Sequence, residues 1–125
     1  MINPRKNGGF RRTMKNQIGL RHLYSLWLDK YTNGYINDLN DNYEYEGNLK
    51  IKAGYDNSIY NEEHYVLKIN GNLDIRNTSI SKLPEGLNVR SLWADYTPFA
   101  ERVFNDELEN YEKEIIEKTQ NFWLF

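Results

Sequence analysis

Three short segments of this chain repeat one another at nearly regular intervals. In chain order they are Gly47–Ile51, Gly71–Ile75 and Arg90–Ala94. The first two share the pattern G-N-L-x-I, and the third repeats the apolar-x-apolar spacing after a slightly shorter interval. Aligning the last two segments also carries Thr78 onto Thr97 and Ile80 onto Phe99. Such self-similarity indicates stacked supersecondary units, because each unit buries its apolar side against the next.

The copy that spans residues 71–89 shows how such a unit would fold. Leu73 and Ile75 alternate with polar neighbours, which predicts a short strand that points both side chains to one side. Asn77 and Thr78 follow, and both residue types form turns by hydrogen bonding to nearby backbone. The chain then returns apolar side chains to the same interior at Ile80, Leu83, Leu87 and Val89.

The same copy reads L-x-I-x-N-T-x-I-x-x-L-P-E-G-L-x-V, which resembles the short leucine-rich repeat of bacterial and phage proteins. Those repeats carry an L-P-x-x-L element where this chain has Leu83–Leu87. The resemblance covers mainly residues 47–99. It implies a minimal leucine-rich-repeat-like β-solenoid of about three short strands. With an N-terminal and a C-terminal amphipathic helix predicted on either side of it, the expected fold class is α+β. The resemblance also implies protein binding through the exposed strand face, not a reaction.

A second topology fits part of the same sequence. Asn70-Gly71 lies between two apolar stretches, and this dipeptide is a strong signal for a tight β-hairpin turn. The alternative to the solenoid is therefore an antiparallel meander.

The 125 residues are expected to form one domain with several segments. These are a mobile basic arm (1–15), a capping helix (16–34), the repeat stack (47–99), a C-terminal helix (98–119) and an apolar tail (120–125). Asn16 is the expected N-cap of the first helix, whose apolar stripe contains Leu20, Leu23, Trp27 and Tyr31. Residues 35–46 lack the order of ligands of a calcium-binding loop, so we expect a solvated polar loop.

The C-terminal helix has its own start signal. Thr97 as N-cap and Pro98 at the first helical position predict where it begins. Its apolar stripe is expected to contain Ala100, Phe104, Leu108, Tyr111 and Ile115. Asp106 with Glu109 gives a second capping signal, which predicts a break near Asn105. The bulky apolar tail is expected to dock, either on the core or on a partner.

The positions between the inward residues of the three strands point outward and form a candidate binding face. They are Lys50, Lys52, Asp74, Arg76, Trp93 and Asp95. In a parallel stack, Lys50, Asp74 and Trp93 would lie in one row. Mixed charge around an exposed Trp suits protein binding, because Trp and Arg are enriched among the residues that dominate interface energies. The alternative for Trp93 is burial under the C-terminal helix.

The charge distribution offers a second class of function. Residues 1–28 carry six Lys or Arg and no acid, whereas the rest of the chain carries ten basic and eighteen acidic side chains. A short basic arm can follow a phosphate backbone. The alternative function is therefore nucleic-acid binding, with RNA as the ligand, through Arg5, Lys6, Arg11, Arg12 and Lys15.

No motif predicts an enzyme. The chain has no cysteine, which excludes disulfides and thiolate metal sites, and it has two histidines and no glycine-rich phosphate loop. Glu62-Glu63-His64 lacks the H-E-x-x-H spacing that places two metal ligands on one helix face. We therefore expect no catalysis, no cofactor and no bound metal.

Together these patterns predict a small protein-interaction module. Richness in asparagine and tyrosine often accompanies the AT-rich coding of phages, and this chain has seventeen of the first and ten of the second. With the resemblance, this composition favours a bacteriophage protein that binds a host protein and inhibits it. No apolar run has the length of a membrane span, and no signal-peptide pattern opens the chain. We therefore expect a soluble, cytoplasmic protein without membrane contact.

Overall fold

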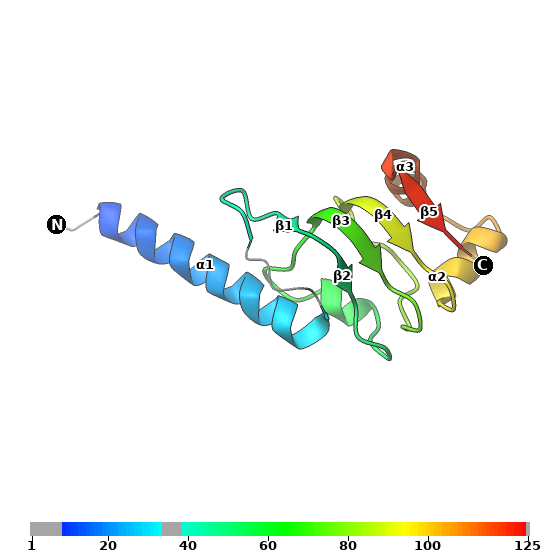
Figure 1. Ribbon diagram of the computed structural model, residues 1–125, viewed down its shortest axis with the longest axis horizontal. Helices are drawn as coiled ribbons and strands as arrows, with labels where there is room; N and C mark the ends of the chain where they lie inside the picture. Colours follow the sequence, from blue (N-terminus) through cyan, green and yellow to red (C-terminus); the bar gives the residue numbers. More distant parts are fainter. Residues whose placement is uncertain (1–8, 34–38, 125) are drawn as a thin grey trace.

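The computed structural model describes residues 9–33 and 39–124, with side chains from residue 19 onward in those ranges. Its elements in chain order are α1 (Gly9–Tyr31), β1 (Tyr45–Glu46), β2 (Leu49–Lys50), a 3₁₀ turn η1 (Asn57–Tyr60), β3 (Lys68–Asp74), β4 (Asn88–Trp93), α2 (Pro98–Phe104), α3 (Asn110–Lys118) and β5 (Asn121–Trp123). This part of the chain is a mixed α/β structure with three α-helices and a five-stranded sheet. Figure 1 shows α1 at one end of the sheet and α2, α3 and β5 at the other.

The strands of this sheet pair in parallel. Their order is β1-β3-β4-β5, and β2 pairs with β3 further along the same edge as β1. Leu49 pairs with Leu73, and Leu73 pairs with Leu92. These registers confirm the alignment of the three repeats that the sequence predicts. The antiparallel alternative is wrong, because β3 continues through Asn70-Gly71 without a hairpin turn.

The close packing around Gly71 explains why this copy of the repeat begins with glycine. The register between β3 and β4 shifts between Ile69 and Asn72, so the chain bulges at this point. A Cβ atom on Gly71 would lie 2.0 Å from the carbonyl oxygen of Gly47, which belongs to the preceding repeat. Glycine therefore lets the two backbones approach closely.

The turns after β3 and β4 repeat the same local structure. The hydroxyl groups of Thr78 and Thr97 each donate to the carbonyl three residues earlier, at 2.7 Å in both cases. Ile80 and Phe99 are fully buried, and the Phe99 amide donates to the Ile80 carbonyl at 3.0 Å. The residues that align in the sequence therefore occupy equivalent places in consecutive turns.

α1 differs from the predicted capping helix at its start and in its buried side. It begins at Gly9, so residues 9–15 are helical and not an arm, and Asn16 lies inside the helix instead of capping it. Residues 1–8 of the predicted arm and 34–38 lie outside the described residues. Trp27 and Tyr31 are buried, and the Trp27 indole donates to the Ile59 carbonyl at 2.7 Å. Leu23 is 42% exposed, because the buried side of the helix includes Leu28 instead, while Tyr24 packs against the core beside the predicted stripe.

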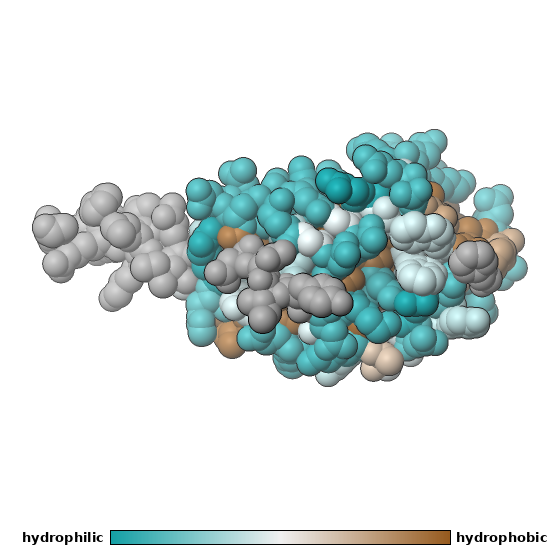
Figure 2. Space-filling model, in the orientation of Figure 1, coloured by the Kyte–Doolittle hydropathy of each residue, from teal (hydrophilic) through white to brown (hydrophobic). Residues whose placement is uncertain are grey.

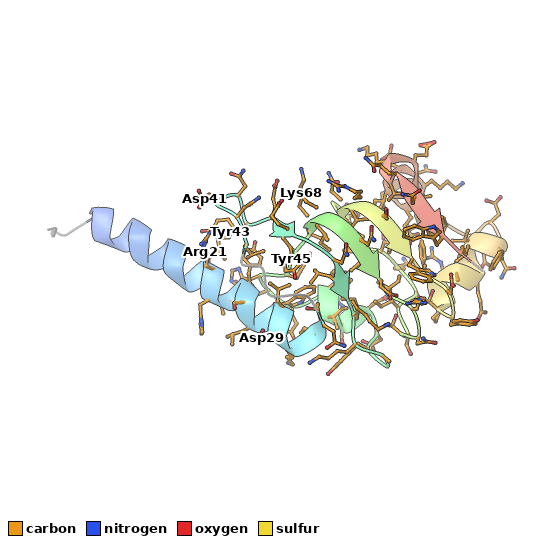
Figure 3. All side chains as sticks on the ribbon, in the orientation of Figure 1. Arg21, Asp29, Asp41, Tyr43, Tyr45 and Lys68 are labelled. Atoms are coloured by element: carbon orange, nitrogen blue, oxygen red, sulfur yellow. The ribbon has the colours of Figure 1, made fainter. Side chains whose placement is uncertain are left out.

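The described part of the loop after α1 is packed at Leu39 and Tyr45 but exposed at Asp41 and Asn42, so the prediction of a solvated loop is correct only in part. Leu39 and Tyr45 are buried and form an isolated antiparallel bridge, and Tyr45 begins β1. Arg21 of α1 donates to the Leu39 carbonyl at 3.0 Å and pairs with Asp41 at 3.4 Å. Figure 3 shows Arg21, Asp41 and Tyr43 gathered where this loop meets α1. The polar residues around Leu39 and Tyr45 suggest a solvated loop, but these two apolar side chains are buried and hold the loop against the rest of the protein.

The C-terminal helix is divided in two. Thr97 caps α2 by accepting from the Ala100 amide at 3.0 Å, as predicted. The predicted break is present after Phe104, but α3 begins at a Glu109–Glu112 capping box and not at Asp106. Phe104 is 65% exposed and not part of the core stripe, because α2 ends there.

A buried ion pair joins the two C-terminal helices. Glu112 is fully buried and pairs with Arg102 of α2 at 2.7 Å. The backbone amides of Leu83 and Glu109 also donate to this carboxylate, at 3.2 and 3.0 Å. Burial would raise the pKa of Glu112, but these hydrogen bonds together with that of Arg102 lower it below its ordinary value.

The apolar tail docks on the sheet. Asn121, Phe122 and Trp123 form β5, which extends the sheet beside β4. The Phe122 ring lies 6.4 Å from the ring of buried Phe99.

No helix of the described residues is both long enough and apolar enough to cross a membrane.

Candidate protein-binding face

Four side chains form a row across the outward face of the sheet, one from each of four strands. The registers place Lys50 of β2 beside Asp74 of β3, Asp74 beside Trp93 of β4, and Trp93 beside Trp123 of β5. All four are partly accessible, whereas the leucines that precede the first three are buried. The row expected from the repeats is present in these registers, and β5 extends it by one residue.

A stacked cation and indole form the centre of the row. The guanidinium of Arg76 lies 3.3 Å from the centre of the Trp93 ring. Asp74 holds the guanidinium there with two hydrogen bonds, from Nε at 3.0 Å and from Nη2 at 2.8 Å. Lys50 approaches the same carboxylate at 3.4 Å. Asp74 and the Trp93 ring therefore hold the Arg76 guanidinium in one orientation before any partner arrives.

The environment of Asp74 keeps this carboxylate charged. Burial would raise its pKa, but hydrogen bonds from the Arg76 side chain and backbone, with the charge of Lys50, lower it below the ordinary value. The Asp74 side chain is 16% exposed and that of Arg76 is 29% exposed. Asp74 and Arg76 therefore form an ionised pair at neutral pH that is partly open to solvent.

Asp95 is predicted to lie on the outward face, but it is buried. Its carboxylate accepts from the Trp93 indole nitrogen at 2.9 Å, and the residue is only 4% exposed. β4 ends at Trp93, so the alternation of inward and outward side chains no longer applies two residues later. The buried Asp95 thus orients the Trp93 indole through this hydrogen bond instead of facing a partner.

Trp93 is partly exposed and not fully buried. Its ring lies 5.8 Å from the ring of Trp123, which sits beside it on β5. Lys52, the last of the six predicted residues, donates to the Asp29 carbonyl of α1 at 3.0 Å. Lys52 therefore links β2 to α1 at the far end of the face from the Trp pair.

Trp123 is the member that sequence reasoning missed. Phe122-Trp123-Leu124 repeats the apolar-x-apolar spacing of Leu92-Trp93-Ala94 further along the chain. That signal could have placed Trp123 outward, but it is very short and lies too far from Trp93 to match the period of the other copies.

The residues of the nucleic-acid alternative are not placed. Arg5 and Lys6 lie outside the described residues, and Arg11, Arg12 and Lys15 lie in the part of α1 before residue 19, where no side chains are described. Among the residues with described side chains, no group of three or more His, Asp or Glu is arranged to hold a metal ion.

Comparisons with protein-family models, with curated protein sequences and with solved structures give no match to this chain.

Proposed function

We propose that this protein is a small interaction module that binds a protein partner through the outward face of β2, β3, β4 and β5. The observation that carries the proposal is the Arg76–Trp93 stack, which Asp74 and Asp95 hold from two sides. Trp and Arg are the side chains that most often dominate interface energies. Because strands and hydrogen bonds already orient both groups, binding immobilises little additional side-chain freedom.

We also propose that the sheet is a minimal leucine-rich-repeat-like solenoid. Parallel pairing in the register of the repeats supports this reading. The threonine-to-carbonyl hydrogen bond recurs at Thr78 and Thr97, as stacked coils of one design require. Asn77 and Tyr96 share a left-handed backbone, with φ of 62° and 60°, at the matching position of each turn. In such proteins the strand face is where a partner binds.

The proposed partner is a bacterial host protein, which the module inhibits by covering part of its surface. The resemblance to bacterial and phage repeats supports this class of partner, and so does the composition rich in asparagine and tyrosine. The mixed charges of Lys50, Asp74 and Arg76 around the two Trp rings fit a polar protein surface with a small apolar centre.

The test is quantitative capture from a bacterial lysate treated with nuclease. Tagged wild-type protein is compared with Trp93→Ala and Arg76→Glu, and with Lys113→Glu as a control that makes the same charge reversal on the exposed side of α3. We expect both face variants to recover at least about tenfold less of the captured protein, as loss of a central Trp or Arg commonly costs more than about 2 kcal/mol. The control should recover as much as the wild type.

Two results would contradict the proposal. Equal recovery by Trp93→Ala and wild type would show that the partner binds elsewhere. Capture that nuclease abolishes, and that weakens steeply with salt, would instead support nucleic-acid binding, since phosphate contacts release counterions. In that case, neutralising Arg11 and Arg12 should reduce retention more than Trp93→Ala does.

A further inference from the structure

A second surface feature lies beside α2, apart from the Trp93 row. It is an open hollow of about 420 Å³ lined by Tyr96, Thr97, Pro98, Ala100, Glu101 and Phe104. Two of its lining residues are large aromatics that point into solvent, since Tyr96 is 73% exposed and Phe104 is 65% exposed. Figure 2 shows hydrophobic surface at the end of the molecule that carries α2.

Core packing does not explain why these rings are exposed. Tyr96 has a left-handed backbone with φ of 60°, a conformation that costs free energy for a bulky residue. The matching position of the preceding turn holds Asn77, a residue type that tolerates this conformation well. Phe104 ends α2, one helical turn after Ala100 on the same side of the helix. The lining of the hollow thus includes two exposed rings that are not part of the buried core.

The lining of the hollow carries a negative charge. Glu101 lines it, and the Glu101 carboxylate makes no ion pair or hydrogen bond with any residue whose side chain is described. The neighbouring Arg102 does not neutralise it, because Arg102 is engaged by Glu112 at 2.7 Å. Residues 95–118, which include α2 and α3, carry eight acidic and three basic side chains, an excess of negative charge that favours a cationic ligand.

We propose that this hollow binds the guanidinium group of an arginine on a partner protein. Aromatic rings attract a cation placed over them, and an adjacent carboxylate adds a charge-assisted hydrogen bond. Arginine suits the site better than lysine because its planar group stacks on rings and is less strongly hydrated. Tyr96 and Phe104 supply the rings and Glu101 the counter-charge. This site goes beyond the strand face, since it uses other residues and a different chemistry.

The probe is N-acetyl-arginine amide, titrated into the isotope-labelled full chain and followed by NMR. N-acetyl-citrulline amide, which has the same shape without the charge, is the matched ligand control at equal ionic strength. We expect saturable shifts at Tyr96, Glu101 and Phe104 with the arginine compound and at least about threefold weaker binding of the citrulline compound. Glu101→Gln should weaken the arginine compound about two- to fivefold, the range for an exposed ion pair.

Matched variants separate this site from general attraction to acidic surface. Glu114→Gln removes an equivalent charge from the exposed side of α3 and should leave the titration unchanged. Phe104→Ala should weaken the arginine compound without lowering the melting temperature, because the ring is already exposed. Equal binding of both compounds, or equal effects of Glu101→Gln and Glu114→Gln, would overturn the proposal. The probe contains no protein partner and the variants leave Trp93 intact, so this result is independent of the strand-face proposal.

Discussion

Replacing Gly71 by alanine places a methyl group inside the backbone of the neighbouring repeat. The new Cβ atom would lie 2.0 Å from the carbonyl oxygen of Gly47 and 2.5 Å from its carbonyl carbon. Neither atom can move away easily, because Gly47 directly precedes the paired segment that holds buried Leu49 against Leu73. Relief requires the two backbones to separate, at a cost of about 2–3 kcal/mol, within the range for overpacked cores.

That cost is a large part of the stability of a domain this size, which is about 5–15 kcal/mol. We expect Gly71→Ala to lower the midpoint of urea unfolding and to lower the melting temperature by about 10 °C. Gly19→Ala is the control, because its Cβ would meet nothing within 4 Å and lies in α1. It should stabilise by about 0.5–1 kcal/mol. Equal unfolding free energies of Gly71→Ala and wild type would refute the close approach of the two repeats.

Two further predictions concern the core and the buried ion pair. Leu73→Ala should lower the unfolding free energy in denaturant titration by about 2–5 kcal/mol, the range for buried leucine. Asp74→Ala should lower it less, and equal effects would mean that the inward register is wrong. The lowered pKa of Glu112 stabilises the fold above the unfolded pKa, about 4.3, and the benefit is lost as pH falls through the folded value. Arg102→Ala should therefore cost about 3–5 kcal/mol at pH 7 and progressively less as pH falls through the folded pKa of Glu112, measured by unfolding across acidic pH, and a pH-independent cost would contradict this pairing.

The sequence predicts the pairing of β2, β3 and β4 because stacked repeats put equivalent residues side by side. An apolar residue at Leu73 needs apolar neighbours on both sides, and the aligned repeats supply Leu49 and Leu92. The outward position of Trp93 follows from the same alternation, whereas Arg76 lies two residues beyond the end of β3 and is held by Asp74. Their mutual stacking does not follow from the alternation, because it depends on how Asp74 orients the guanidinium.

The failures lie where tertiary contacts override local pattern. Asp95 follows the last residue of β4 by two positions, so the strand alternation that predicts an outward side chain has already ended. β5 forms because its backbone pairs with the edge of β4. The short apolar alternation around Trp123 does not predict this pairing. Leu23 and Phe104 fit helical stripes, but the helices meet the core over only part of their length.

The most direct test of the proposed binding face is the affinity of the captured partner for Trp93→Ala, measured by calorimetric titration against wild type. Truncation removes the hydrogen bond to buried Asp95, so the variant should lose about 1–3 kcal/mol of stability and is measured well below its melting temperature. Leu26→Ala is the control, since Leu26 is an exposed apolar residue on α1. We expect the Trp93→Ala variant to bind at least about tenfold more weakly, with Leu26→Ala unchanged. Binding of a folded Trp93→Ala variant within about twofold of wild type would contradict the account.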